Sequence, residues 1–130
     1  MTILFKPILR KHPAKPEEKP LYYASAVARG TVDLNHLAHL MADGSTVRRA
    51  DVYAVLLGAT DLMLRLLAQG QRVTLGELGS FVVHVSSAGY PEQEQVIAPR
   101  VTKSRIIFRP SSTFKQSLSA LRFEKAAPQL

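Results

Sequence analysis

The sequence predicts an α+β fold with strands toward both ends of the chain and helices in the middle. Residues 33–42 and 47–69 have apolar side chains at helical spacing. Runs of apolar and β-branched residues typical of strands occur before residue 30 and again between residues 72 and 109. The length of 130 residues suits one domain with a short extension.

The N-terminal segment predicts two strands, residues 2–10 (TILFKPILR) and 21–29 (LYYASAVAR). Pro7 has no N–H to donate to a ladder, so we expect it at an edge or a bulge. Residues 11–20 contain three prolines among charged residues and predict an extended link or long turn.

Two helices should follow. In the first, residues 33–42, Thr31 or Asp33 can cap the start, and the sequence DGS at 43–45 ends it. Thr46 is the expected N-cap of the second helix, residues 47–69. The apolar positions of the first helix are Leu34, Leu37, Ala38 and Met41.

The second helix is apolar on nearly every side. Between Val52 and Gly70 its only charged residues are Asp61 and Arg65. A helix of this kind is normally buried, and the chain has few other elements to cover it. We therefore expect a two-fold homodimer; the alternative is cover by the N-terminal strands and the last helix within a monomer.

Gly70 should stop this helix, and a hairpin should follow. Val73 and Leu75 lie on one short strand, and Phe81, Val83 and Val85 alternate on the next. Residues 86–95 are polar and turn-rich, and residues 96–109 predict a broken strand with basic residues, ended by Pro110. Ser111 or Ser112 should cap a last helix, residues 113–123, whose inner face is Phe114, Leu118 and Leu121.

The chain is basic and contains no cysteine. Its net charge is +7, with six Lys/Arg against two Asp/Glu in residues 1–30, three against four in 31–70 and eight against four in 71–130. This distribution suits a polyanionic partner or a solvated basic surface, and both interpretations stay open. Disulfides and thiolate metal sites are excluded, and we expect neither a signal peptide nor a membrane-spanning segment.

Two motifs in this order resemble the HU/IHF family of bacterial histone-like proteins. One is Gly79-Ser80-Phe81, within QRVTLGELGSF, and the other is Phe108-Arg109-Pro110 before the last helix. The resemblance covers about residues 31–122. The first thirty residues are similar to the extension of HU-related proteins of the Bacteroides group, with Tyr22–Ala24 as its YYA-type strand.

The resemblance implies an intertwined homodimer with a helical base, a β-saddle and β-arms, plus extra N-terminal strands. Residues 1–30 would be the extension, 31–125 the DNA-binding domain and 126–130 a loose tail. The implied activity is non-catalytic binding of double-stranded DNA with weak sequence preference, in the cytoplasmic nucleoid. No cofactor, metal, membrane or small-molecule substrate is expected.

The expected DNA contacts are basic side chains of the returning strand and its flanks. Lys103, Arg105 and Arg109 share strand parity and can line one face. The family's Arg-Asn-Pro arm tip is absent, and Pro91 is the candidate wedge, with the unfavourable carboxylates Glu92 and Glu94 after it. The full candidate set is Arg100, Lys103, Arg105, Arg109, Lys115, Arg72, Arg48 and Arg49, each with a solvated surface charge as its alternative.

The sequence leaves other functions open, with weaker support. An HU-fold interaction module that has lost strong DNA binding is the main alternative, since the arm tip is acidic and the extra strands offer an edge for strand addition. His36 and His39 are spaced for a shared metal, but no third ligand is evident beyond the nearby Asp33 or Asp43, so solvated histidines are favoured. No arrangement of nucleophile and base indicates an enzyme, and no stacking strand of the RNA-recognition kind is visible.

Overall fold

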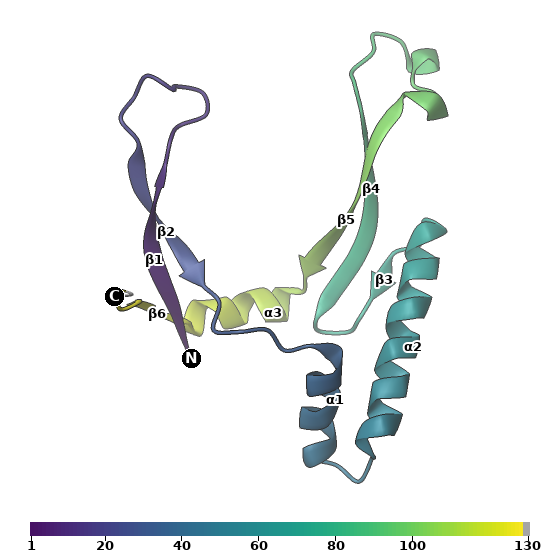
Figure 1. Ribbon diagram of the computed structural model, residues 1–130. Helices are drawn as coiled ribbons and strands as arrows, with labels where there is room; N and C mark the ends of the chain where they lie inside the picture. Colours follow the sequence, from purple (N-terminus) through teal and green to yellow (C-terminus); the bar gives the residue numbers. More distant parts are fainter. Residues whose placement is uncertain (129–130) are drawn as a thin grey trace. The chain divides into compact units, whose positions relative to one another are not determined.

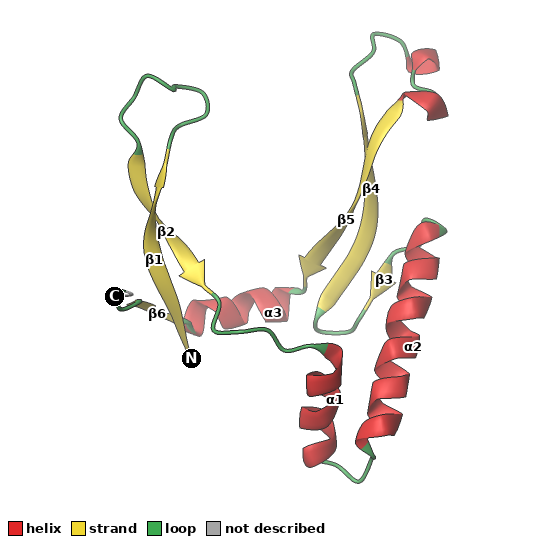
Figure 2. Cartoon of the chain, in the orientation of Figure 1, coloured by secondary structure: helices red, strands yellow, loops and turns green. Residues whose placement is uncertain are grey.

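The structure is a computed structural model that describes residues 1–128, and its chain divides into two compact units. The strand unit comprises Met1–Thr31 together with residues 117–128, and the helix–arm unit comprises Val32–Gln116. Figure 1 follows the chain through both units, and Figure 2 shows its helices and strands.

The strand unit is built on a three-stranded sheet of order β2-β1-β6. Strand β1 (Thr2–Arg10) pairs antiparallel with β2 (Leu21–Val27), as the sequence predicts, although β2 ends two residues early. Strand β6 (Arg122–Lys125) runs parallel to β1 and pairs with Thr2–Phe5. Among residues 1–128, the part of β1 that contains Pro7 therefore has a strand partner on one side only, which fits the predicted edge position.

The last helix is shorter than predicted. Helix α3 covers Ser112–Ser117, a 3₁₀ turn covers Leu118–Ala120, and the helix does not continue to residue 123. The backbone at Leu121 turns extended, and the N–H of Arg122 donates to the carbonyl of Met1 at 3.0 Å. Pairing with β1 thus overrides the helical pattern of this segment. The expected tail, residues 126–130, follows β6. Its first residue is still tied to the sheet, since the N–H of Ala126 donates to the carbonyl of Phe5 at 2.8 Å. Residues 129–130 lie outside the described part.

The helix–arm unit opens with the two predicted helices. Helix α1 spans Leu34–Asp43, and Asp33 caps it by accepting a hydrogen bond of 2.7 Å from the N–H of His36. Helix α2 spans Arg49–Ala68, and Gly70 follows its end with a φ of 82°. The N-cap expected at Thr46 is wrong. The N-cap is Arg48, which has an extended backbone and makes no side-chain cap hydrogen bond. The helix begins two residues later than predicted because Ser45 Oγ accepts the N–H of Val47 and extends the preceding turn.

The helix–arm unit buries little of its apolar surface within one chain. In the described residues the only fully buried apolar side chains are Ala38 and Leu67. On α2, Val55 is 71% exposed, Leu62 54% and Leu64 59%. The predicted apolar character of α2 on several sides is therefore present, and α1 together with the neighbouring sheet covers only part of it.

The predicted hairpin is a sheet of order β3-β4-β5, comprising β3 (Val73–Thr74), β4 (Gly79–Ser87) and β5 (Val101–Pro110). The turn between β3 and β4 uses Gly76 with φ of 51°, and the N–H of Leu75 donates to the carbonyl of Gly79 at 2.9 Å. At Gly79 the strands approach so closely that a Cβ would lie 2.2 Å from the carbonyl oxygen of Arg109. The glycine of the Gly-Ser-Phe motif is thus a steric requirement at the start of the β4–β5 pairing.

Candidate nucleic-acid interface

The β4–β5 ladder places three of the predicted basic residues on one face. Arg105 pairs with His84, Lys103 with Ser86 and Arg109 with Ser80, with no register irregularity between these pairs. Since alternate residues of a strand point to the same face, the side chains of 103, 105 and 109 project together. The strand parity predicted from the sequence is confirmed. We call Lys103, Arg105 and Arg109 the arm cations.

His84 belongs to the same face and contacts one of the arm cations. Its Nε2 lies 3.2 Å from Nη2 of Arg109, so a neutral imidazole accepts a hydrogen bond from the guanidinium. His84 also stands directly opposite Arg105 in the ladder. The contact joins residues 25 positions apart, so it follows from the register of the two strands and not from a local sequence pattern.

The other face of the arm is apolar and turned toward the helices. Phe81 and Phe108 pair across the strands with ring centroids 5.0 Å apart. Val83 and Ile106 border a hollow of about 560 Å³ with Leu64 of α2, and Arg105 also lines this hollow. The sequence predicts Ile107, Phe108 and Val83 in the core rather than as wedges. Val83 and Ile107 are half-buried, whereas Phe108 is 39% exposed in the single chain. The arm therefore has a packing face and an opposite face that carries charge.

Arg100 lies apart from the arm cations. It ends a 3₁₀ turn, Ala98–Arg100, before β5 begins, so its expected place on the strand is wrong. Its guanidinium carbon sits 4.7 Å from the centre of the Tyr90 ring, and its Nη1 donates to the carbonyl of Gln95 at 2.9 Å. Stacking on an aromatic face and donating to a carbonyl are both favourable for arginine. Arg100 thus holds the arm tip together.

The arm tip is a locally hydrogen-bonded turn. The side chain of Glu92 accepts from the backbone of Gln95, and the Gln95 side chain accepts from the N–H of Glu92 at 3.3 Å. Pro91 is exposed beside this turn, and Glu94 lies within it. The candidate wedge therefore stands next to two carboxylates on a tip that is already ordered by its own contacts.

The flanking candidates are dispersed. Arg48 and Arg49 begin α2, where Nη1 of Arg49 donates to Oδ1 of Asn35 at 2.6 Å, and Arg72 is exposed before β3. Lys115 lies in α3. Its backbone N–H donates to the carbonyl of Ser111 at 2.9 Å, so this N–H is not free to bind an anion. Ser111 caps this helix, as predicted, by accepting from the N–H of Phe114 at 3.1 Å, and its hydroxyl donates to the carbonyl of Glu77.

The described residues also bear on other kinds of site. His39 lies 3.7 Å from a carboxylate oxygen of Asp43 on the same helix. Within residues 1–128 no three His, Asp or Glu side chains are grouped to hold a metal ion. None of the helices in this part of the chain has the length and apolar character required to cross a bilayer.

Two helices followed by a three-stranded sheet with a long, one-sidedly basic arm define a small α+β class with an HU-like helix–arm unit. A family model described as "HU domain fused to wHTH, Ig, or Glycine-rich motif" matches residues 1–125. The chain therefore belongs to this HU-HIG family. The match includes β1 and β2, so the N-terminal strands are part of the family's pattern.

Two solved structures have a similar fold. One is a proposed bacterial DNA-binding protein from Bacteroides vulgatus, with a TM-score of 0.65 and 11% identity over 98% of this chain and 50% of that one. The chain thus spans about half the length of that protein. The other is Anabaena HU in a cocrystal with DNA, with a TM-score of 0.52 and 18% identity over 68% of this chain and 98% of that one. At these identities the likeness concerns the fold alone. A search among curated proteins finds no match.

Proposed function

We propose that this chain is a non-catalytic, HU-like protein that binds double-stranded DNA as a homodimer with weak sequence preference. The observation that carries the proposal is the row of arm cations on the face of β4–β5 opposite the packing face. Membership in a family named for its HU domain and the fold shared with a DNA-bound HU support it. We place the protein in the cytoplasmic nucleoid on the same grounds.

The chemistry of the arm suits phosphate contact better than base recognition. Arginine and lysine bind phosphate oxygens on any sequence, and the released counterions supply most of the affinity. This arm differs from a purely basic arm because its tip carries two carboxylates. Glu92 and Glu94 oppose phosphates, so contact is expected along the arm cations, and Pro91 contributes less to bending than a basic tip with a proline wedge does.

The exposed α2 surface supports the homodimer. Val55, Leu62 and Leu64 are each more than half exposed in the single chain. Burying one such side chain stabilises by about 1.5–3 kcal/mol. A two-fold partner that presents the same surface covers these positions economically.

The proposal is tested by fluorescence anisotropy of a labelled duplex titrated with the full chain at several salt concentrations. If about six phosphates are neutralised, the log–log dependence of the binding constant on salt has a slope near −5. Arg105→Glu combined with Arg109→Glu should weaken binding at least tenfold at low salt while the protein stays a dimer by sedimentation. Binding without salt dependence contradicts the electrostatic account, and unchanged affinity of the double variant removes both arginines from the site.

A second candidate function is an HU-fold interaction module that no longer binds DNA strongly. The ordered acidic tip favours it, because the contacts of Arg100 and the Glu92–Gln95 pair order a turn whose carboxylates, Glu92 and Glu94, repel phosphate. A folded dimer that fails to bind duplex at low salt would make this candidate the leading one.

A further inference from the structure

The two units of the chain share its positive charge unequally. The strand unit contains eight Lys/Arg and three Asp/Glu, a net charge of +5. The helix–arm unit, which resembles HU, contains nine and seven, a net charge of only +2. Most of the basic character that suggests a polyanionic partner therefore belongs to the N-terminal strands and β6.

The charge gathers at the tip of the β1–β2 hairpin. Arg10 ends β1 and pairs in register with Leu21, so both ends of the connecting loop meet there. Residues 10–19 carry four basic and two acidic side chains and are exposed throughout. We call the basic ones, Arg10, Lys11, Lys15 and Lys19, the hairpin cations.

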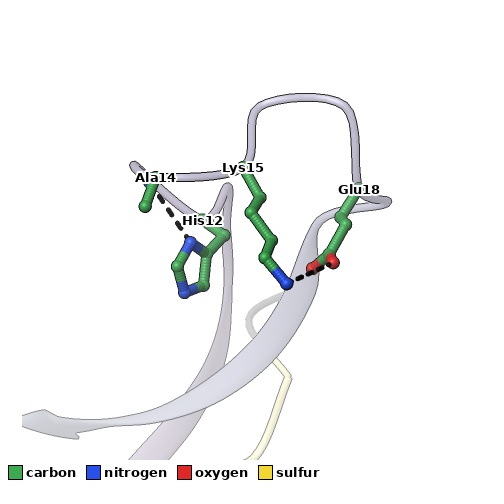
Figure 3. Close-up of polar contacts among 4 residues, drawn as sticks. All are labelled: His12, Ala14, Lys15 and Glu18. Atoms are coloured by element: carbon green, nitrogen blue, oxygen red, sulfur yellow. Dashed lines mark hydrogen bonds and ion pairs between the residues drawn. The ribbon is translucent and has the colours of Figure 1, made fainter.

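The loop that carries them has two successive hydrogen-bonded turns. The N–H of Lys15 donates to the carbonyl of His12, and the N–H of Glu18 donates to the carbonyl of Lys15, both at 3.2 Å. Nδ1 of His12 also accepts from the N–H of Ala14 at 3.2 Å (Figure 3). These bonds and the prolines limit the loop's freedom, so a ligand that binds here loses less conformational entropy.

The hairpin cations are available to a phosphate. Lys15 pairs with Glu18 at 3.4 Å, and both side chains are more than half exposed. Such surface pairs are weak and exchange readily for another anion. For Arg10, Lys11 and Lys19 the described residues supply no carboxylate within ion-pair distance.

The sheet behind the tip has one strongly apolar face. Ile3, Phe5, Ala24 and Phe123 border a shallow hollow on that side. Lys6 and Arg122 have the opposite strand parity and project from the other face. Leu4, Ile8 and Glu124 also lie on that other face, so the cations are concentrated at the exposed tip of the hairpin rather than on one face of the sheet.

The two hairpins of the chain differ in sign at their tips. The loop from Ala88 to Gln95 at the end of β4 carries Glu92 and Glu94 and no basic residue, whereas residues 10–19 carry a net charge of +2. A two-stranded ribbon fits a duplex groove, and its affinity comes from the cations it brings to the phosphates. The hairpin with the better charge for this task is β1–β2.

We propose that the β1–β2 hairpin is a second DNA-contacting element, which binds backbone phosphates of the duplex through Arg10, Lys11 and Lys19. This inference rests on the proposed DNA binding and assigns part of that binding to the strand unit. The arm cations and the hairpin cations then act as two separate phosphate-binding surfaces.

The test compares the full chain with the variant Arg10→Gln, Lys11→Gln, Lys19→Gln in the same salt titration. The variant removes three phosphate contacts from each protomer, so it should reduce the salt slope by about 2–3 for every protomer whose hairpin touches the duplex. Binding at 0.1 M salt should weaken by at least about 100-fold. An unchanged slope and affinity overturn the inference. Wild-type protein that does not bind at all instead refutes the proposed function, and the Arg105→Glu, Arg109→Glu variant reports on the arm independently.

A sign-reversed control comes from the same loop. Glu17→Gln with Glu18→Gln removes two exposed carboxylates and should tighten binding and steepen the slope. Its failure to do so contradicts a phosphate near this loop. Because Glu17 and Glu18 are exposed, this double variant should fold even if the triple variant does not. It then tests by itself whether the hairpin contacts phosphate.

A local readout separates contact from a general loss of charge. The chain has no cysteine, so Ala14→Cys gives a single attachment point for a photoreactive group at the hairpin tip. Charges further than about 10 Å are largely screened at 0.1 M salt, whereas a cross-link requires contact. A cross-link to labelled duplex that unlabelled duplex competes away supports the inference, and no cross-link under conditions where the protein binds overturns it.

Discussion

Gly79 offers the sharpest test of how the arm is built. A Cβ at this position would lie 2.2 Å from the carbonyl oxygen of Arg109 and 2.8 Å from the Cα of Pro110. Ordinary contacts between such atoms are about 3.5 Å, so Gly79→Ala forces β5 away from β4 by about 1.3 Å. Both contacts are to backbone, which cannot rotate aside as a side chain does.

The expected loss of stability has two sources. Gly79 has a φ of 142°, a conformation that an L side chain rarely adopts, and holding alanine there costs about 1–3 kcal/mol. Separating the strands next to the Gly79–Pro110 and Ser80–Arg109 pairs disrupts at least one hydrogen bond, for about 1 kcal/mol. We expect a total of about 3 kcal/mol.

Urea denaturation followed by circular dichroism measures this effect. With a dependence of about 1–3 kcal/mol per molar urea, a loss of 3 kcal/mol lowers the midpoint by about 1–3 M. Wild type and variant must be compared at equal protein concentration, because the stability of a dimer depends on concentration.

Gly89→Ala is the matched control. Gly89 also lies in the arm, but nothing is within 4 Å of its added Cβ and its φ needs no glycine. Its change in stability should stay within about 0.5 kcal/mol. A midpoint for Gly79→Ala no lower than that for Gly89→Ala would refute the steric account of the Gly-Ser-Phe motif.

Three further changes test the dimer and the arm tip. Leu64→Asp on α2 should give sedimentation at the mass of one 14.3 kDa chain with loss of helical signal; a folded dimer would exclude this position from the interface. Arg100→Ala should speed amide exchange at the arm tip, since the Tyr90 contact and the bond to Gln95 are lost; unaltered exchange would leave Arg100 without a bracing role. Glu92→Gln with Glu94→Gln should tighten DNA binding about fivefold at low salt, and weaker binding would contradict repulsion by these carboxylates.

The helices and the arm were predictable because their signals are local. Apolar spacing fixes α1 and α2, and a short acidic cap at Asp33 sets where α1 begins. Alternation and glycine placement locate β3 and β4. The start of α2 was misplaced by two residues because the Ser45 hydroxyl competes for a backbone N–H, a choice that propensity alone does not decide.

Strand β6 was not predictable in the same way. Residues 118–123 have helical spacing, yet the backbone becomes extended at Leu121, and the strand that follows depends on pairing with β1, more than 110 residues earlier in the chain. Long-range pairing leaves no local pattern, since a strand of four residues is too short to show alternation clearly.

The candidate site was half predictable. Strand parity alone placed Lys103, Arg105 and Arg109 on one face, because period two holds wherever a strand is unbroken. The contacts of Arg100 and His84 could not be predicted, because they depend on which residues lie opposite each other across the arm. Arg100 leaves the strand for a 3₁₀ turn and stacks on Tyr90, and His84 reaches Arg109 through the ladder.

The charge distribution shows why the division into units matters for function. Along the sequence, the first thirty residues and the last sixty carry the same net charge of +4, which suggests two equivalent basic flanks. In the structure Arg122 and Lys125 join the N-terminal strands through β6, and the acidic tip of the arm remains with the helices. The strand unit therefore carries the larger net charge, and under the proposed DNA binding we expect it to contribute most of the electrostatic attraction, while the helix–arm unit adds one row of cations. An HU-like protein with this division loses much of its salt-dependent affinity when the hairpin cations are neutralised, even with every residue of its arm intact.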